Sequence, residues 1–241
     1  MKHCPRCQWT SIVKNGFVGE KQRYKCKRCK YQFTRTTPRG YPPAHKKLTV
    51  LLYCHGMSMN AISKLFQVST TAVLKWIRNF AKKQAPKPVL APGTPVVLEL
   101  DEMWHYIKNK KNKLWIWKVL DRNTGHLIDW ECGGRNKETL EKLTTRLAVL
   151  DVQVFYTDKW HVYETLLPTT KHVQTKAETH RIERNNCLMR HWFGRFKRKS
   201  IIVSKSVEMV DLTIALFARF RVNADMFDIL NLSEGQQNII S

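Results

Sequence analysis

Acidic residues are nearly missing from the first 95 residues of this chain. Glu20 is the only acid there, against 19 Lys and Arg residues. The remaining residues have 23 basic and 18 acidic side chains, so most of the net charge of +23 lies in the first part. A segment with one acid cannot neutralise itself through internal ion pairs, so its charges face solvent or a polyanion. We therefore expect nucleic acid as the partner, with a merely soluble basic protein as the alternative.

Long apolar runs are also lacking, because no stretch approaches the ~18 residues that a membrane span requires. Residues 1–4 lead directly into a cysteine pair without an apolar leader. We therefore expect a cytoplasmic protein, in which thiols stay reduced. Four of the seven cysteines are paired at close spacing and three are isolated, which indicates a metal site and not a disulfide framework.

Residues 1–40 are predicted to form a zinc ribbon. Two C-x-x-C pairs, Cys4–Cys7 and Cys26–Cys29, have 18 residues between them, and two such turns can surround one ion with four sulfurs. Four-sulfur coordination leaves no open position, so one structural Zn²⁺ per chain is expected, with redox dithiols as the alternative. Asn15-Gly16 is expected to be a turn between two strands. The side chains expected to contact DNA here are Arg23, Lys25, Lys27 and Arg28.

Residues 41–83 are predicted to form a helix-turn-helix domain. Apolar spacing indicates helices over residues 46–54, 59–66 and 70–82, with Ser58 and Ser69 as caps of the second and third. Gln67 stands where glycine often permits the positive φ of the turn. In the third helix, Thr70, Thr71 and Lys75 are expected in the major groove and Arg78 on a phosphate. A small helical bundle without groove contacts is the alternative. Residues 84–95 contain four prolines and are predicted to be an extended linker.

Residues 96–241 are predicted to form an α/β catalytic domain. The apolar run 96–100 indicates a short buried strand that ends in Asp101 and Glu102, which would point to opposite faces. Two further strands, a helix over residues 136–150 and a fourth strand ending in Asp158 follow. The fourth strand can lie parallel to the first after a crossover, which would bring Asp101 and Asp158 close together. Oxygen ligands of this kind suit two Mg²⁺ or Mn²⁺ ions.

A basic helix predicted over residues 178–198 supplies the third acid. Glu183 is the choice, and Glu178 is the rival because it lies near the helix start, where a carboxylate is favoured as a cap. His180 could position a phosphate or water, with a capping or packing role as the alternative. The side chains expected on the DNA backbone are Arg181, Arg184, Arg190, Arg195, Lys197, Arg198 and Lys199. A last amphipathic helix is expected over residues 207–221. The acids Asp121, Asp129 and Glu131 are attributed to turn chemistry and solvation.

Three segments resemble the Asp-Asp-Glu motifs of transposases with a ribonuclease-H-like core, namely Leu100–Trp104, Tyr156–Trp160 and Arg181–Asn185. Asp158 and Glu183 have 24 residues between them. Together with the cysteine motif and the helix-turn-helix ahead of them, these segments are similar to the insertion sequence one family over nearly all of residues 1–225. The resemblance implies binding to the terminal inverted repeats, cleavage at the element ends and joining of the freed 3′-OH groups to target DNA. It also implies a bacterial protein associated with the nucleoid. At least a homodimer on DNA is expected, because two ends must be brought together. Three alternatives remain: a zinc-containing transcription regulator, a nuclease that does not join, and a disabled transposase.

Overall fold

The computed structural model describes residues 3–34 and 40–232. The chain divides into two compact units, Met1–Pro42 and Pro43–Ser241, and each is described by itself. The predicted zinc module and catalytic domain extend into residues 35–39 and 233–241, which lie outside the described residues. Among the described residues, no helix has the length and apolar character needed to cross a membrane.

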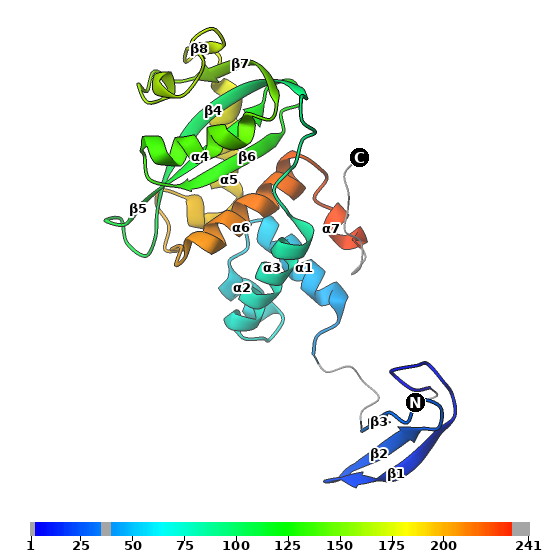
Figure 1. Cartoon of the computed structure of the whole chain (residues 1–241). Coiled ribbons are helices and arrows are strands. Elements are labelled where there is room, and N and C mark those ends of the chain that lie inside the picture. Colours follow the sequence, from blue (N-terminus) through cyan, green and yellow to red (C-terminus); the bar gives the residue numbers. More distant parts are fainter. Residues whose placement is uncertain (1–2, 35–39, 233–241) are drawn as a thin grey trace. The chain divides into compact units, whose positions relative to one another are not determined.

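The first unit is a small antiparallel sheet of three strands, β1 (Ile12–Val18), β2 (Lys21–Cys26) and β3 (Gln32–Phe33) (Figure 1). The turn between β1 and β2 lies at Gly19-Glu20 and not at Asn15-Gly16, so that prediction is wrong. Asn15-Gly16 instead forms an irregularity within β1, where Gly16 has a φ of +71° and its carbonyl accepts a hydrogen bond from the Gln22 side chain. A glycine with positive φ therefore marks a bulge here.

The second unit begins with three helices, α1 (Pro43–Cys54), α2 (Met59–Leu65) and α3 (Thr70–Gln84). Ser58 and Ser69 cap α2 and α3 as predicted, each accepting a hydrogen bond from the backbone N–H three residues later. Gln67 adopts a φ of +52°, so the turn between these helices has a left-handed residue without glycine. The helices share a core with later segments, for example through Tyr53, whose hydroxyl contacts Thr213 Oγ1 at 2.9 Å.

A five-stranded mixed sheet follows, in the order β6-β5-β4-β7-β8 (Figure 1). β4, β5 and β6 are antiparallel, whereas β7 lies parallel to β4 and β8 parallel to β7. The parallel pairing of the first and fourth predicted strands is thus confirmed, and β8 is an addition that the sequence did not indicate. The strands are β4 (Pro95–Tyr106), β5 (Lys113–Asp121), β6 (Leu127–Gly133), β7 (Asp151–Thr157) and β8 (His172–Gln174).

Helices cover both faces of this sheet. α4 packs its leucines against Leu98, Leu100 and Val119 on one face, while α5 and α6 share a core with Met103 and Ile116 on the other. The predicted helix over residues 178–198 is shorter than expected and is followed by a 3₁₀ turn, Gly194–Phe196, and the last predicted helix ends in a π-helix, Ala218–Val222. The helices are α4 (Lys137–Leu147), α5 (His180–Trp192), α6 (Val207–Phe217) and α7 (Asp228–Asn231).

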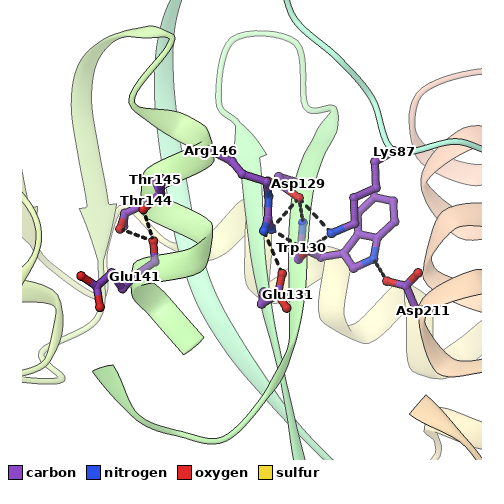
Figure 2. A network of polar contacts seen from close by, with 9 residues as sticks. All are labelled: Lys87, Asp129, Trp130, Glu131, Glu141, Thr144, Thr145, Arg146 and Asp211. Carbon is purple, nitrogen blue, oxygen red and sulfur yellow. Dashed lines mark hydrogen bonds and ion pairs between the residues drawn. The ribbon is translucent and has the colours of Figure 1, made fainter. Parts of the chain in front are cut away.

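The linker is fixed to the sheet by a partly buried polar network (Figure 2). Lys87 donates to Asp129 at 3.3 Å, and Arg146 of α4 donates to the same carboxylate at 2.7 Å and pairs with Glu131 at 2.9 Å. Solvation was therefore the wrong explanation for Asp129, which is buried. Asp121 does serve the hairpin turn, because it accepts hydrogen bonds from the backbone of Asn123 and Thr124. The linker joins two parts of one compact unit, and a domain division there stays a prediction.

Candidate metal centres and DNA interface

The cysteine cluster of the first unit has the geometry of a four-sulfur site. The sulfurs of Cys4, Cys7, Cys26 and Cys29 all lie within 4.8 Å of one another, with 3.7 Å between Cys4 and Cys29 and 3.6 Å between Cys7 and Cys26. A tetrahedral zinc with bonds of about 2.3 Å places its sulfurs ~3.8 Å apart. Burial raises the pKa of Cys26, but hydrogen bonds from the backbone N–H groups of Cys29 and Arg28 and from the side chains of Cys7 and Cys29 outweigh burial and bring the pKa to about 7. These four residues fit Zn²⁺.

The acidic cluster of the second unit arises from the register of two strands. β4 pairs with β7 up to Glu99 and Tyr156, and the same register extended by two residues places Asp101 opposite Asp158. β7 ends at Thr157, so the edge of β4 is open at this point. Carboxylate oxygens of Asp101, Glu102 and Asp158 all lie within 4.8 Å of one another. Asp101 and Glu102 are not at the end of a strand as expected, because β4 continues to Tyr106.

Asp101 is held between a buried lysine and helix α5. Its cross-strand partner in β5 is Lys118, whose side chain is 0% exposed and donates to Asn185 Oδ1 at 2.5 Å. The next residue of α5, Asn186, donates to Asp101 Oδ2 at 2.5 Å. Burial raises the pKa of Asp101 to about 7, with Glu102 adding to the rise and Lys118 opposing it. The three carboxylates are opposed by Lys118 beside Asp101 and by Arg135 at Glu102, so the cluster keeps a negative charge that favours a divalent cation.

Glu102 faces the opposite side of β4 and has partners of its own. Its Oε1 accepts from Arg135 Nε at 2.7 Å, and its Oε2 accepts from the Tyr163 hydroxyl at 2.9 Å. The Arg135 guanidinium lies 4.8 Å from the centre of the Trp115 ring and 4.7 Å from that of Trp160. Two aromatic faces and a carboxylate thus fix this arginine beside the acidic cluster. Because both oxygens of Glu102 are engaged, it is less free to bind a metal than Asp101 or Asp158.

Glu183 lies on α5 three residues before Asn186, so both occupy one face of that helix. Its side chain is exposed and lies outside the group of three acids that come together. The rival, Glu178, forms an ion pair with Arg122. His180 is exposed at the first position of α5, with its Nδ1 3.2 Å from the Ala177 carbonyl oxygen. The catalytic roles of Glu183 and His180 stay predictions.

The predicted DNA contacts lie on several surfaces, most of them exposed. In the first unit, Lys27 and Arg28 are exposed, whereas Lys25 and Arg23 are half-buried and the Arg23 side chain donates to the Asn15 carbonyl. In the second unit the half-buried ones are Arg78, Arg190 and Arg195, and the exposed ones are Thr70, Thr71, Lys75, Arg181, Arg184, Lys197, Arg198 and Lys199. Arg78 lies 3.6 Å from Glu208, so this carboxylate competes with any phosphate for it.

The sequence interpretation missed four side chains at the site. Lys118 and Glu99 each interrupt an apolar strand run, which was a usable signal because a charge inside such a run must have a buried partner. Arg135 and Tyr163 come from loops and turns, and nothing in their local sequence links them to Glu102.

The family model of the IS1 transposase matches residues 95–226, which is more than half of the chain. The chain belongs to the IS1 transposase family. Among its relatives, the Insertion element IS1 2 protein InsB of Escherichia coli K12 is 35% identical over 145 residues, covering 58% of this chain and 87% of the relative. The Insertion element IS1 9 protein InsB of the same strain is 34% identical over the same coverage.

A solved structure, the simian T-cell lymphotropic virus intasome in complex with the PP2A regulatory subunit B56 gamma, aligns with 82% of this chain and 78% of its own at 15% identity. Its TM-score of 0.36 is too low to identify a fold. This member of the IS1 transposase family is a transposase, an enzyme of DNA recombination, and not a transcription regulator. The other two alternatives, a nuclease that does not join and a disabled transposase, are separated by the experiment proposed below.

Proposed function

We propose that this transposase binds the terminal inverted repeats of its insertion sequence, cleaves at the element ends to free 3′-OH groups and joins them to target DNA. The observation that carries the proposal is the meeting of Asp101 and Asp158 at the open edge of β4, within reach of one ion. The sheet order, with three antiparallel strands followed by two parallel ones, supports a ribonuclease-H-like core.

Asp101 and Asp158 would hold Mg²⁺ or Mn²⁺, with Glu183 from α5 as the third acid. Bound ions of this kind polarise the scissile phosphate and activate the attacking oxygen. The chain itself supplies the positioning: Asn186 fixes one oxygen of Asp101, and the backbone N–H of Trp160 fixes Asp158 Oδ1 at 3.0 Å. His180 at the start of α5 would position a phosphate or water.

The structural zinc would hold the first unit together, so that its basic side chains can contact the DNA backbone. The N-terminal part of α3 would read base edges in the major groove through Thr70, Thr71 and Lys75, which are all exposed. The basic side chains of α5 and the segment after it would bind phosphates. Two element ends must be held at once, so the active species would be a homodimer or a larger oligomer.

The test uses Mg²⁺ and labelled DNA that carries the element's own ends, with a gel that separates cut and joined strands. Asp158→Asn should bind the ends like wild type but lower both cleavage and joining more than about 100-fold, because it removes one charged ligand. Asp151→Asn is the matched control, since Asp151 is an exposed acid at the start of the same strand, and it should react like wild type.

The same assay separates the two candidates for the third acid. Glu183→Gln should behave like Asp158→Asn, whereas Glu178→Gln should retain activity because its carboxylate serves an ion pair with Arg122. A wild-type protein that binds the ends but neither cleaves nor joins them with Mg²⁺ or Mn²⁺ would refute the proposed reaction. Cut ends without joined products would indicate a nuclease that does not join DNA.

A further inference from the structure

The segment between α5 and α6 carries an isoleucine in full contact with solvent. Ile201 is 99% exposed, although isoleucine is among the residues most often buried in folded proteins. The side chains of Lys197, Arg198 and Lys199 precede it and Lys205 follows it, all exposed. No acid occurs between Gly194 and Val207. An apolar tip surrounded by cations fits a polyanion that also offers an apolar surface.

Both flanks of this tip are fixed to the protein. Ile202 packs so closely on Gly194 that a Cβ added there would lie 2.6 Å from Ile202 Cδ1. Ser204 is buried, with its Oγ 2.9 Å from His105 Nε2, and its carbonyl accepts a hydrogen bond from the Lys108 N–H at 2.8 Å. The exposure of Ile201 is therefore built into the fold of the segment.

Ile201 also lies beside the helix expected to read base edges. It lines a cavity of about 600 Å³ together with Thr70, Thr71 and Arg78 of α3 and with Arg195 and Lys205. All of these residues belong to the same compact unit. A duplex held at the N-terminal end of α3 would thus be next to Ile201, and the surrounding cations would face its phosphates.

We propose that Ile201 is a wedge that inserts between stacked base pairs of the DNA bound by α3 and the basic segment 195–205. Lys and Arg side chains can bind phosphates, and the faces of the stacked bases offer an apolar surface against which an isoleucine can leave water. Insertion of an apolar side chain partly unstacks a base step and kinks the duplex, which the added contacts offset. The wedge rests on the proposed function, because it requires DNA at this surface.

The experiment places 2-aminopurine, whose fluorescence rises when it is unstacked, at successive positions of a duplex that carries the element's terminal inverted repeat. Wild type should raise the fluorescence at one or two adjacent positions. Ile201→Ala should abolish that rise and weaken binding about tenfold, whereas Ile201→Leu should retain both. Val89→Ala is the matched control, because Val89 is 90% exposed in the linker and should change neither reading.

The outcomes separate this inference from the proposed function. Failure of the wild-type protein to bind the terminal duplex would overturn the proposed function, whatever Ile201 does. Binding and cleavage without a fluorescence change at any position, or an unchanged signal with Ile201→Ala, would overturn the wedge alone. Loss of the signal with Val89→Ala as well would show that the change does not arise at Ile201. Thermal unfolding of all variants should match wild type, because both side chains are exposed.

Discussion

At the scale of single residues, the second unit contains ionisable side chains that are held away from water. His105 in β4 is 4% exposed and bonds to Ser204, and burial lowers its pKa to about 4, with Arg195 and Arg190 adding to the effect. Lys118 is fully buried, and burial lowers its pKa to about 7 while Asp101 opposes the fall. The cost of burying each group is offset by a specific partner.

His105 makes stability depend on pH in a defined direction. In the unfolded chain it takes up a proton near pH 6.5, whereas in the folded chain it stays neutral down to about pH 4. The contribution of neutral His105 to the free energy of unfolding is therefore complete above pH 6.5. It is lost as the pH falls towards 4, and the loss amounts to about 3 kcal/mol in total. Urea unfolding of wild type and His105→Gln between pH 7 and 4.5 measures this.

The free energy of unfolding of wild type should fall by about 2 kcal/mol more than that of His105→Gln over this range. Comparing how steeply the free energy of unfolding falls with pH in the two proteins removes the contribution of the other groups that titrate. It also removes any constant cost of the substitution. Parallel curves for the two proteins would show that the folded state accepts a proton on His105 as readily as the unfolded state does.

At the scale of elements, helix α5 is fastened to β4 at two points. Glu99, which is 0% exposed, accepts a hydrogen bond from the backbone N–H of Ile182 at 2.9 Å, and Asp101 accepts one from Asn186. Glu99 and Asp101 are two residues apart, so both face α5. The first bond satisfies an N–H in the first turn of the helix, one residue before Glu183. The position of α5 over the acidic cluster therefore depends on a carboxylate outside the group of three acids.

Removing the hydrogen bond between Glu99 and the Ile182 N–H should loosen the attachment of α5 to β4. Glu99→Ala leaves the Ile182 N–H without its acceptor in a buried place and removes one of the two carboxylates that pair with Arg122. The free energy of unfolding should therefore fall by about 2–3 kcal/mol. Hydrogen exchange should show faster exchange of the α5 amides than of the α4 amides. Glu208→Gln, which removes an exposed ion-pair partner of Lys82, should leave the free energy of unfolding nearly unchanged. Equal protection of the α5 amides from hydrogen exchange in wild type and Glu99→Ala would show that Glu99 does not hold α5 in place.

The elements also show what the sequence could predict. Apolar periodicity located strands β4 to β7 and helices α1 to α6, and a serine ahead of an apolar run located the caps at Ser58 and Ser69, because those signals are local. The left-handed turn at Gln67 was recognised from its place between two helices, although its residue type argued against it. The arrangement of Arg135 between Trp115 and Trp160 could not be predicted, because it depends on three segments that only the tertiary fold brings together.

At the scale of the whole molecule, the acidic site follows from topology. The crossover from β4 through α4 to β7 makes the two strands parallel, so their register brings Asp101 opposite Asp158. The order of the predicted strands and helices already indicated this parallel pairing of β4 and β7. It did not predict that Glu102 would join the group, because alternation alone places neighbouring side chains on opposite faces. Because β7 ends at Thr157, the edge of β4 beyond it is open, and the side chains of Asp101 and Glu102 can both approach Asp158 there.

The division of the chain into two compact units predicts a selective effect of metal removal. The core of the first unit is formed by the cysteines and a few side chains such as Ile12, Tyr24 and Phe33, which is too little to fold without the metal. A strong zinc chelator should therefore unfold β1–β3, and the Cys26→Ser variant should do the same without a chelator.

The second unit has two large hydrophobic clusters of its own, so its thermal transition should stay within about 2 °C of that of the untreated protein. Circular dichroism with thermal scans, and mass spectrometry for one zinc per chain, measure both effects. Binding to the terminal repeats should weaken, because the basic side chains of the first unit lose their fixed positions. A joint collapse of both units on zinc removal would show that the first unit is required for the fold of the second.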